Sequence, residues 1–329
     1  MANIVWMQTG ACSGESMALL CADRPSIENL VEHYGLNFLW HPSLTAEHRF
    51  GDVLDALLSG REKLDILCIE GSLMTGPNGS GQYDTWKGRA KIDIVRQLAP
   101  LATHVVAMGT CAAFGGVHAA GPNPTDCTGL QYLNNQPGGL LGAAFRTPDG
   151  LPVVNIAGCP THPGWVVDTL EKAALEGLQP EDLDEFGRPQ LYAGGLVHHG
   201  CARNEYYEFK ASAQKQSDLG CLMENLGCKG TQAHADCNLR PWNGSGSCLR
   251  GGFACIACTE PGFESPGHAF QETPKLAGIP IGLPTDMPKA WFVALAALSK
   301  SATPKRVRNN AVADHPVILP AVRKKGAGK

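Results

Sequence analysis

The sequence predicts an α/β fold in which a doubly wound parallel sheet is followed by a loop-rich, cysteine-rich region. Two observations lead to this prediction. Apolar, β-branched runs alternate with helical patterns over roughly the first half of the chain, and six of the 13 cysteines lie between residues 220 and 262. Strands that alternate with helices form parallel sheets with both faces covered. The first half of the chain is therefore predicted to form one open parallel sheet.

Five short apolar runs rich in Val, Ile and Leu account for the predicted strands. Helical periodicity separates several of them. We expect strands at residues 3–7, 36–40, 64–71, 103–109 and 151–158, and helices at residues 50–60 and 88–102.

The alternation of strands and helices stops after Leu196. Residues 197–285 are rich in Gly, Cys, Pro and Asn and contain no long periodic segment, so they are too irregular to bury a core without crosslinks. We expect an inorganic group to organise this region. The predicted divisions are a sheet domain at 1–196, a cysteine-rich domain at 197–290 and a basic extension at 291–329.

Composition narrows the class of protein and its compartment. The chain has 329 residues, 43% hydrophobic and 18% charged, and its net charge of -4 argues against a general nucleic-acid binder. The N-terminus lacks a basic segment, a long apolar segment and a twin-arginine pair, and no run of about 18 apolar residues occurs. We therefore expect a cytoplasmic protein without membrane association. Because disulfides are rare in that reducing compartment, clustered cysteines indicate metal or redox chemistry.

The C-terminal tail is the exception to this charge balance. Against a single acid, Asp314, it carries Lys300, Lys305, Arg306, Arg308, Arg323, Lys324, Lys325 and Lys329. Such a tail is either a solvated segment or a docking segment for a partner.

Three cysteines follow predicted strand ends. Cys12, Cys111 and Cys159 come just beyond the first, fourth and fifth strands, each near glycine. Since the carboxyl ends of parallel strands share one edge, where ligands bind in open α/β sheets, we expect the three thiols to converge there. One such cysteine alone would as readily be a small buried hydrophobe, but all three at strand ends favour a metal site. The cysteines without this placement are interpreted as ordinary buried residues: Cys21, Cys68 and Cys127.

The second half of the chain has more specific spacing. Cys255 and Cys258 form a CxxC followed by Pro261, which lets two thiolates hold one metal centre. Cys237 and Cys248 lie upstream and complete a set of four. Four cysteines hold either a zinc ion or a cubane cluster, so spacing alone leaves the metal open.

A second set of four begins with an HxxC. His198 and Cys201 have this spacing, and Cys221 and Cys228 follow. A histidine beside a second histidine, here His199, is more often a surface residue. The spacing to Cys201 favours a metal ligand instead.

Glu70 lies just past a predicted strand end, near the expected thiols. It is interpreted either as a structural hydrogen-bond acceptor or as a proton-handling group. The Gly-rich stretch at 76–82 lacks the spacing of a phosphate-binding loop and is interpreted as an ordinary loop.

Seven motifs together resemble one family. In chain order they are GACSGES, EGSLMTGPNG, GTCAAFGG, AGCPTHPGW, HHGCARNEYYEF, GCLMENLGCKG and ACIACTEPGF. Over residues 3–290 the chain resembles the small, electron-transferring subunit of nickel-iron hydrogenases. Each motif alone is weak, but their order and spacing are specific.

This resemblance implies a flavodoxin-like domain with a proximal iron-sulfur cluster, then a loop-rich domain with a medial and a distal cluster. By resemblance the proximal ligands are Cys12, Cys111 and Cys159, the distal ones His198, Cys201, Cys221 and Cys228, and the medial ones Cys237, Cys255 and Cys258. It also implies a partner large subunit that holds the nickel-iron centre.

Two positions depart from the family pattern. The first motif of the family is usually CxxC, but Glu15 stands where the second cysteine is expected. A carboxylate is a harder ligand than a thiolate. Three interpretations of Glu15 are open. It completes a 4Fe-4S cluster, or it does not bind iron and leaves a water or a three-iron cluster in the site. The third is that it is only a first-turn acid favoured by the helix dipole.

The second departure adds a ligand. Many family members have a three-iron medial cluster, with proline near the place of a fourth cysteine, whereas this chain has Cys248. We therefore predict three 4Fe-4S clusters, the medial one with Cys248 and the proximal one with Glu15 as ligand or with three irons.

The resemblance implies that hydrogen cleavage and electron transfer take place in two different subunits. Hydrogen would be cleaved in the large subunit, and electrons would pass from the proximal through the medial to the distal cluster. The motif around His198 and the four medial cysteines resemble the cytosolic hydrogen-sensing subclass, which signals to a histidine kinase. The basic extension would then dock that kinase or a second copy of the heterodimer.

Two alternatives accompany this prediction. One is a cytosolic uptake hydrogenase that feeds a quinone-linked or soluble carrier. The other is an iron-sulfur subunit of a quinone-reducing complex, which would share only the sheet domain. The medial and distal motifs argue against the second alternative.

Overall fold

The structure, a computed structural model, describes residues 1–46, 48–265 and 270–316. The chain forms two compact units. The first comprises Met1–Val197, Ala233–Ser247 and Ala257–His268, and the second comprises His198–Gln232, Cys248–Ile256 and Ala269–Lys329. Two segments of the cysteine-rich half thus belong to the same unit as the sheet.

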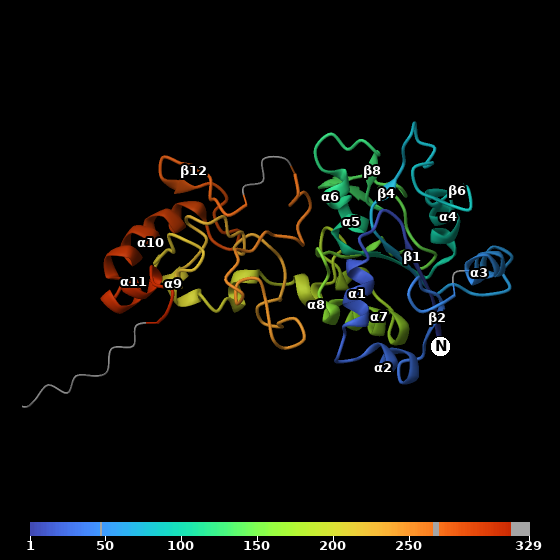
Figure 1. The fold of residues 1–329 in the computed structure, drawn as a ribbon, viewed down its shortest axis with the longest axis horizontal. Coiled ribbons are helices and arrows are strands. Elements are labelled where there is room, and N and C mark those ends of the chain that lie inside the picture. The colour runs from blue at the N-terminus through green and yellow to red at the C-terminus, as the bar shows by residue number, and fades with distance from the viewer. Residues whose placement is uncertain (47, 266–269, 317–329) are drawn as a thin grey trace, which may run out of the picture. The chain divides into compact units, whose positions relative to one another are not determined.

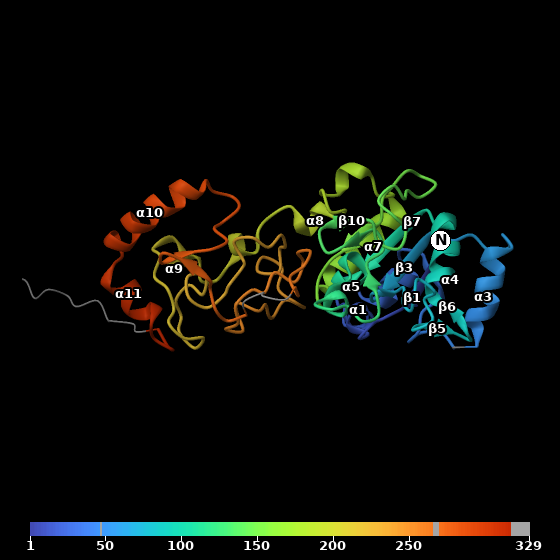
Figure 2. The same ribbon diagram turned by 90° about the horizontal axis from the view of Figure 1, so that it is seen from above.

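The sheet of the first unit has five parallel strands, at the places where the apolar runs predicted them (Figure 1, Figure 2). They are β1 (Ala2–Gln8), β2 (Leu36–Trp40), β3 (Ile66–Glu70), β7 (His104–Met108) and β11 (Val154–Ile156). Their order, β11-β7-β3-β1-β2, is the flavodoxin-like doubly wound order. The predicted fold class is confirmed, and the switch point lies between β1 and β3.

Helices cover both faces of this sheet. The two predicted helices are present as α3 (Arg49–Leu58) and α4 (Lys91–Leu98), which bury apolar side chains against β1, β3 and β7. Because Pro100 has no N–H with which to continue α4, the chain goes on as the 3-10 helix η1 (Ala99–Leu101). The other face carries α1 (Gly14–Leu20) and α2 (Ile27–Glu32), both in contact with α7 (Pro163–Leu175).

Short elements complete the first unit. Two-residue antiparallel pairs are β4 (Leu73–Met74) with β8 (Cys127–Thr128), β5 (Thr85–Trp86) with β6 (Arg89–Ala90), and β9 (Tyr132–Leu133) with β10 (Gln136–Pro137). The short helices are α5 (Gly109–Phe114), α6 (Gly116–Ala119), η2 (Pro180–Asp182) and α8 (Gln190–Ala193). Such pieces are too short to show a periodicity, so the sequence did not predict them.

The second unit has little regular structure before residue 289, as its composition predicted. The chain enters it through η3 (Val197–Gly200), and its short elements are α9 (Asn204–Glu208) and the hairpin of β12 (Lys275–Leu276) and β13 (Ile279–Pro280). Two further helices follow, α10 (Lys289–Ala302) and α11 (Lys305–Ala311). Among the residues whose structure is described, no helix combines the length and apolar character that a membrane span requires.

The described part of the basic extension is folded. Val307 and Ala311 of α11 are buried against Ala211, and Thr303 Oγ1 donates to the carbonyl of Phe209 at 2.8 Å. The interpretation as a solvated tail is therefore wrong for residues 300–311. The cations at 323–329 lie outside the described residues.

Candidate metal centres

The three strand-end cysteines lie close together. Cys12 follows β1, Cys111 lies in α5 directly after β7, and Cys159 follows β11. The pKa of the Cys111 thiol is raised to about 12, first by burial and then by the nearby Cys159, Glu15 and Cys12. The pKa of Cys159 is raised to about 11 by burial and, in the same way, by Glu15 and Cys12. Cys12 and Glu15 are thus near enough to Cys111 and Cys159 to oppose the ionisation of these two thiols.

Backbone contacts hold the loops that carry these cysteines. The Thr110 amide donates to the Gly158 carbonyl, and the Gly158 amide donates to Thr110 Oγ1, both at 2.9 Å. Gly10 and Ser72 pair through their amides and carbonyls at 2.9 and 3.1 Å. Since Thr110 and Gly158 directly precede Cys111 and Cys159, the backbone itself places those two thiols side by side.

Glu15 lies within this group of thiols. It is only 5% exposed, and burial first, then the nearby Glu70, raises its pKa to about 8. The carboxylate packs over Gly109, where an added Cβ would overlap Glu15 Oε1 and where φ is +87°. A carboxylate that served only as a first-turn acid would remain at the surface. Its position therefore favours a role toward the proximal site.

Glu70 accepts hydrogen bonds from five donors at the end of β3. Two are the backbone amides of Glu15 and Ser16, each at 3.2 Å. Three are side-chain donors: Trp6 Nε1 at 2.8 Å, Gln8 Nε2 at 3.1 Å and Ser16 Oγ at 2.5 Å. Because Glu70 is fully buried, these contacts favour the structural interpretation, in which it holds the first turn of α1 in place.

Three of the four predicted distal ligands come together in the second unit. Burial raises the pKa of the Cys221 thiol to about 12, and Cys228 and Cys201 act in the same direction. The Arg203 amide donates to Cys201 Sγ at 3.3 Å, and the Met223 amide donates to the Cys221 thiol. Hydrogen bonds to ligand sulfurs are one of the ways in which a protein tunes a cluster.

A carboxylate orients His198, the fourth predicted distal ligand. Asp286 Oδ2 lies 2.9 Å from His198 Nε2 and 3.1 Å from His199 Nε2. The other ring nitrogen of His198, Nδ1, is buried and has no hydrogen-bond partner among the described residues. Metal-bound histidines have this arrangement, because a carboxylate on one ring nitrogen directs the other toward the metal. His198, His199 and Asp286 would also form a small metal site by themselves, but that would leave Nδ1 unused.

The four predicted medial ligands are divided between the two units. Cys237 and Cys258 belong to the first unit, and Cys248 and Cys255 belong to the second. Their convergence on one centre stays a prediction.

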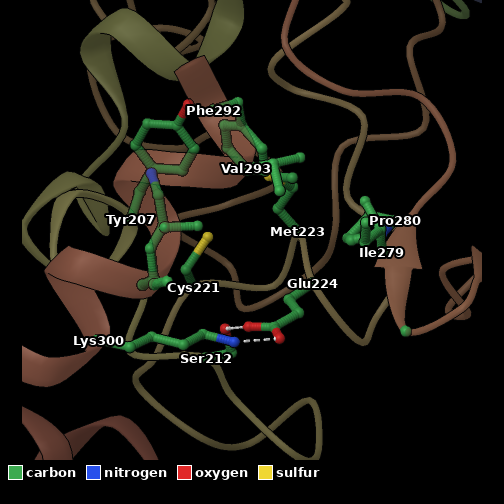
Figure 3. Close-up of a pocket in the computed structure, with 14 residues that line it drawn as sticks. Tyr207, Ser212, Cys221, Met223, Glu224, Ile279, Pro280, Phe292, Val293 and Lys300 are labelled. Carbon is green, nitrogen blue, oxygen red and sulfur yellow. Dashed lines mark hydrogen bonds and ion pairs between the residues drawn. The ribbon is translucent and has the colours of Figure 1, made fainter. Parts of the chain in front are cut away.

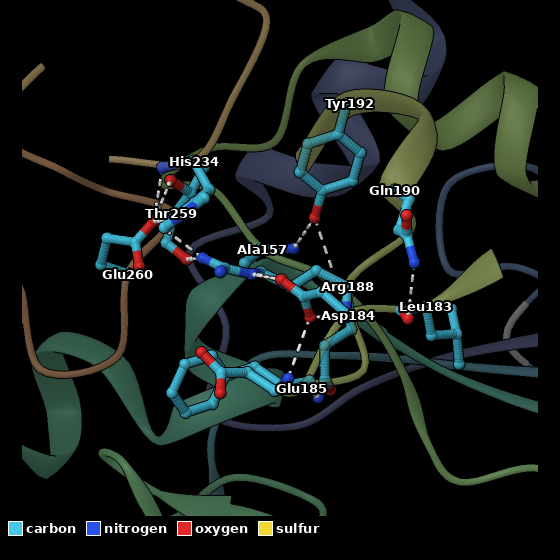
Figure 4. A network of polar contacts seen from close by, with 12 residues as sticks. Ala157, Leu183, Asp184, Glu185, Arg188, Gln190, Tyr192, His234, Thr259 and Glu260 are labelled. Carbon is cyan, nitrogen blue, oxygen red and sulfur yellow. Dashed lines mark hydrogen bonds and ion pairs between the residues drawn. The ribbon is translucent and has the colours of Figure 1, made fainter. Parts of the chain in front are cut away.

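A buried arginine organises the first-unit part of this set (Figure 4). Arg188 is 1% exposed. Its guanidinium donates to Asp184 Oδ2 at 2.7 Å, to Glu260 Oε1 at 2.8 Å and to the Thr259 carbonyl at 3.1 Å. The charge of Arg188 is thus matched by two carboxylates, as a buried cation requires.

The same carboxylate holds both segments that carry medial cysteines. Glu260 Oε1 also accepts from the His234 amide at 2.6 Å, three residues before Cys237. The carbonyl of Cys258 accepts from Thr110 Oγ1 at 2.5 Å, next to Cys111. The segments of Cys237 and Cys258 are therefore fixed to the sheet unit and to each other.

The remaining cysteines and supporting residues differ in how well the sequence predicted them. Cys68 and Cys127 are buried, as interpreted, but Cys21 is exposed just after the end of α1, so that interpretation is wrong for it. The sequence contained no indication of the roles of Arg188 and Asp286, because nothing in their local pattern links them to a cysteine or histidine far along the chain.

The donors fit iron-sulfur clusters. The pKa values of Cys111 and Cys159 are raised by the acidic groups around them. A cationic iron core bound among these groups would favour their ionised forms. The buried His198 Nδ1 lacks the partner that an iron atom would supply.

Comparisons with known proteins agree with these sites. The family described as NADH ubiquinone oxidoreductase, 20 Kd subunit, matches residues 12–173, and the family described as the C-terminal part of the NiFe/NiFeSe hydrogenase small subunit matches residues 193–271. The F420 non-reducing hydrogenase II small subunit of Methanosarcina mazei is 32% identical over 284 residues, covering 79% of this chain and 73% of that protein. The periplasmic NiFeSe hydrogenase small subunit of Desulfomicrobium baculatum is 34% identical over 283 residues, covering 80% and 84%. The chain belongs to the small subunits of nickel-iron hydrogenases.

A solved structure of this family has the same fold. The actinobacterial-type NiFe-hydrogenase from Ralstonia eutropha H16 matches 97% of this hydrogenase small subunit and 95% of its own chain, with a TM-score of 0.74 at 29% identity. Hydrogenase small subunits transfer electrons, carry iron-sulfur clusters and pair with a large subunit that holds the nickel-iron centre. The match of the second half to the hydrogenase family also agrees with the argument against a subunit of a quinone-reducing complex.

Proposed function

We propose that this small subunit relays electrons through three iron-sulfur clusters held by the residues that the sequence predicted. The convergence of the strand-end thiols with Glu15 carries the proposal, because Thr110 bonds to Gly158 and Glu15 packs over Gly109. The distal group with its oriented histidine supports it. When bound, each cluster accepts and donates single electrons. The predicted ligands would hold the irons, and their partial burial would screen the irons from water. The medial ligands would be Cys237, Cys248, Cys255 and Cys258.

Iron and sulfide content, measured with EPR on the co-expressed heterodimer, tests this relay. The sample is examined oxidised and then reduced under hydrogen. About twelve irons without a three-iron signal are expected if all three sites have four ligands. About eleven irons with a three-iron signal would show that one site lacks its fourth ligand.

Glu15→Ala is expected to convert the proximal site to a three-iron cluster. The variant should lose about one iron per heterodimer and gain a three-iron EPR signal in the oxidised state, because no other ligand replaces the carboxylate. Glu15→Cys should restore the lost iron. Glu28→Ala is the matched control, because Glu28 is the exposed first-turn acid of α2. Equal iron in Glu15→Ala and Glu28→Ala would mean that Glu15 does not bind iron.

Asp286→Asn is expected to raise the potential of the distal cluster and to weaken its retention of iron about tenfold or more. Without the carboxylate, His198 becomes a weaker and less well oriented ligand. An EPR-monitored redox titration and the iron content after dialysis measure both effects. Asp314→Asn is the control, because Asp314 forms an exposed pair of the same kind with His315 at 2.6 Å. A distal potential unchanged in Asp286→Asn would contradict this role.

We further propose that the heterodimer is a cytoplasmic hydrogen sensor that signals to a histidine kinase. The sequence motif around His198 supports this subclass, and α10 offers a docking surface. Trp291, Leu295 and Leu298 are 66%, 44% and 66% exposed, and their spacing of four and three residues puts them on one side of the helix. Exposed apolar stripes of this kind are typical of helices that bind a partner. The alternative function is a cytosolic uptake hydrogenase.

Substituting the exposed stripe tests the sensor proposal more cleanly than deleting residues 300–329, because the deletion would also remove the packed helix α11. The triple variant Trp291→Ser, Leu295→Ser, Leu298→Ser should weaken binding to a purified sensor histidine kinase about tenfold or more. Hydrogen-dependent dye reduction should stay unchanged. A control variant replaces two other exposed leucines by serine, Leu175 and Leu239. Unweakened kinase binding together with fast turnover with a quinone or soluble carrier would favour the uptake function.

A further inference from the structure

Two cavities of the second unit share part of their walls, and Figure 3 shows the first of them. The first has a volume of about 240 Å³ and the second a volume of about 490 Å³. Both are lined by Lys210, Ser212 and Lys300. One molecule can therefore occupy the two cavities at once and contact residues 210–212, α10 and α11.

The first cavity, which we call the apolar cavity, has aromatic walls. Tyr207 and Phe292 are both buried and line it together with Met223 (Figure 3). Ala296 and Ala297 of α10 add small side chains to the wall. Pockets for drug-sized ligands usually measure about 300–1,000 Å³. The apolar cavity therefore suits one or two fused rings, which bind to aromatic side chains by stacking.

The second cavity, which we call the basic cavity, has no carboxylate among the described residues that line it. Its cations are Lys210, Lys300 and Arg308. Lys210 Nζ lies 3.7 Å from the centroid of the Tyr207 ring and forms no ion pair with any residue that the structure describes. Arg308 has no ion pair in the described part of the chain either, and its Nη2 contacts the carbonyls of Lys300 and Thr303 at 3.5 Å. Two of the three cations are thus available to an anion.

The third cation is already paired. Lys300 Nζ donates to Glu224 Oε1 at 2.6 Å, and Ser212 Oγ donates to Glu224 Oε2 (Figure 3). Glu224 is the one carboxylate among the described residues that line either cavity. Three cations against one carboxylate leave two positive charges. A phosphate monoester, which carries close to two negative charges at neutral pH, would balance them.

We propose that the two cavities together bind a mononucleotide, with its base in the apolar cavity and its phosphate in the basic cavity. The base would stack on the aromatic walls, and the Arg308 guanidinium can donate two parallel hydrogen bonds to the phosphate. Cys221, a predicted distal ligand, lines only the apolar cavity. The phosphate would therefore not contact a predicted cluster ligand.

This ligand is distinct from the electron acceptor of the relay, because neither the base nor the phosphate of a nucleotide such as AMP takes up electrons. The site consists of side chains alone, so the inference does not rest on the proposed relay. The mononucleotide would join α10, which carries the proposed docking surface, to residues 210–212. It would also give Lys300 and Arg308 of the basic extension a role other than contact with a protein partner.

Calorimetric titration of the cluster-loaded heterodimer with AMP and with inorganic phosphate tests the site. AMP should bind about tenfold more tightly than phosphate or better, because only AMP places a ring in the apolar cavity. Arg308→Gln should raise the Kd for AMP about tenfold or more. Arg306→Gln is the matched control, because Arg306 lies on the same helix, pairs with Glu205 at 2.9 Å and lines neither cavity. Its Kd should equal that of the unmodified heterodimer.

A second pair of variants tests the place of the base. Ala296→Trp fills the apolar cavity, and Ala294→Trp makes the same change on α10 at a residue that does not line it. Ala296→Trp should raise the Kd for AMP about tenfold or more and leave the Kd for inorganic phosphate unchanged. Ala294→Trp should change neither value. A unit that had lost its fold would bind neither ligand, so this difference separates a filled cavity from misfolding.

Three outcomes would refute the proposal. The first is that the unmodified heterodimer shows no saturable binding of AMP. The second is an equal Kd for AMP and inorganic phosphate, which would mean that no base enters the apolar cavity. The third is equal weakening by Arg308→Gln and Arg306→Gln, which would show that AMP is attracted by the general positive charge of the extension. Viologen reduction under hydrogen, measured on the same samples, tests the relay separately and should be the same with and without AMP.

Discussion

Cys111→Ser is expected to lower hydrogen-dependent dye reduction about hundredfold or more and to remove about four irons per heterodimer. Cys111 is the thiol of the proximal group whose ionisation responds to all of its other members. A serine hydroxyl is a poor replacement for a thiolate, so the proximal cluster would be lost. Electrons released in the large subunit would then have no first carrier. Iron analysis and dye reduction on the purified heterodimer measure the two effects.

Cys21→Ser is the control for this experiment. It makes the same atomic change at an exposed cysteine outside the three predicted sets. Its iron content and rate should equal those of the unmodified heterodimer. Full iron and full activity in Cys111→Ser would show that the proximal assignment is wrong.

Glu70→Ala is expected to destabilise the first unit by about 3–5 kcal/mol. The substitution leaves four buried donors without this acceptor and removes one acceptor of the half-buried Gln8 amide. Two of them are amides in the first turn of α1, so the position of Glu15 would be lost as well. Differential scanning calorimetry at fixed heterodimer concentration should show a Tm lower by about 10 °C.

Two variants control for the loss of Glu70. Glu32→Ala removes an exposed carboxylate from the same unit and should leave the Tm unchanged. Glu70→Gln keeps the volume but brings an amide N–H toward the donors, so its Tm should fall between the other two. A Glu70→Ala protein as stable as Glu32→Ala would show that the network contributes little.

The sheet and the places of its thiols were predictable because both follow from local rules. The apolar runs specify β1, β2, β3, β7 and β11, and parallel strands bring their carboxyl ends to one edge. Cysteines that directly follow those runs therefore had to lie near one another. The spacing of the HxxC and CxxC motifs is equally local.

The supporting residues were not predictable, because their partners lie far away in the sequence. Asp286 contacts His198 across 88 positions, and neither neighbourhood has a pattern that points to the other. The burial of Glu15 depends on Gly109, which leaves room for a carboxylate only because it lacks a Cβ. The apolar packing of α11 rests on Val307 and Ala311 in an otherwise polar segment, in which Asn310 is buried as well.

The contacts of Arg188 have a consequence for the order of events during synthesis. Its acceptors at Thr259 and Glu260 come 71 and 72 positions later in the chain. Until those residues have been made, Arg188 lacks two of its three acceptors. The two contacts can form only after Cys258, the last cysteine of the chain, has been made. The full set of Arg188 contacts therefore exists only on a chain that already carries every thiol of the three predicted ligand sets.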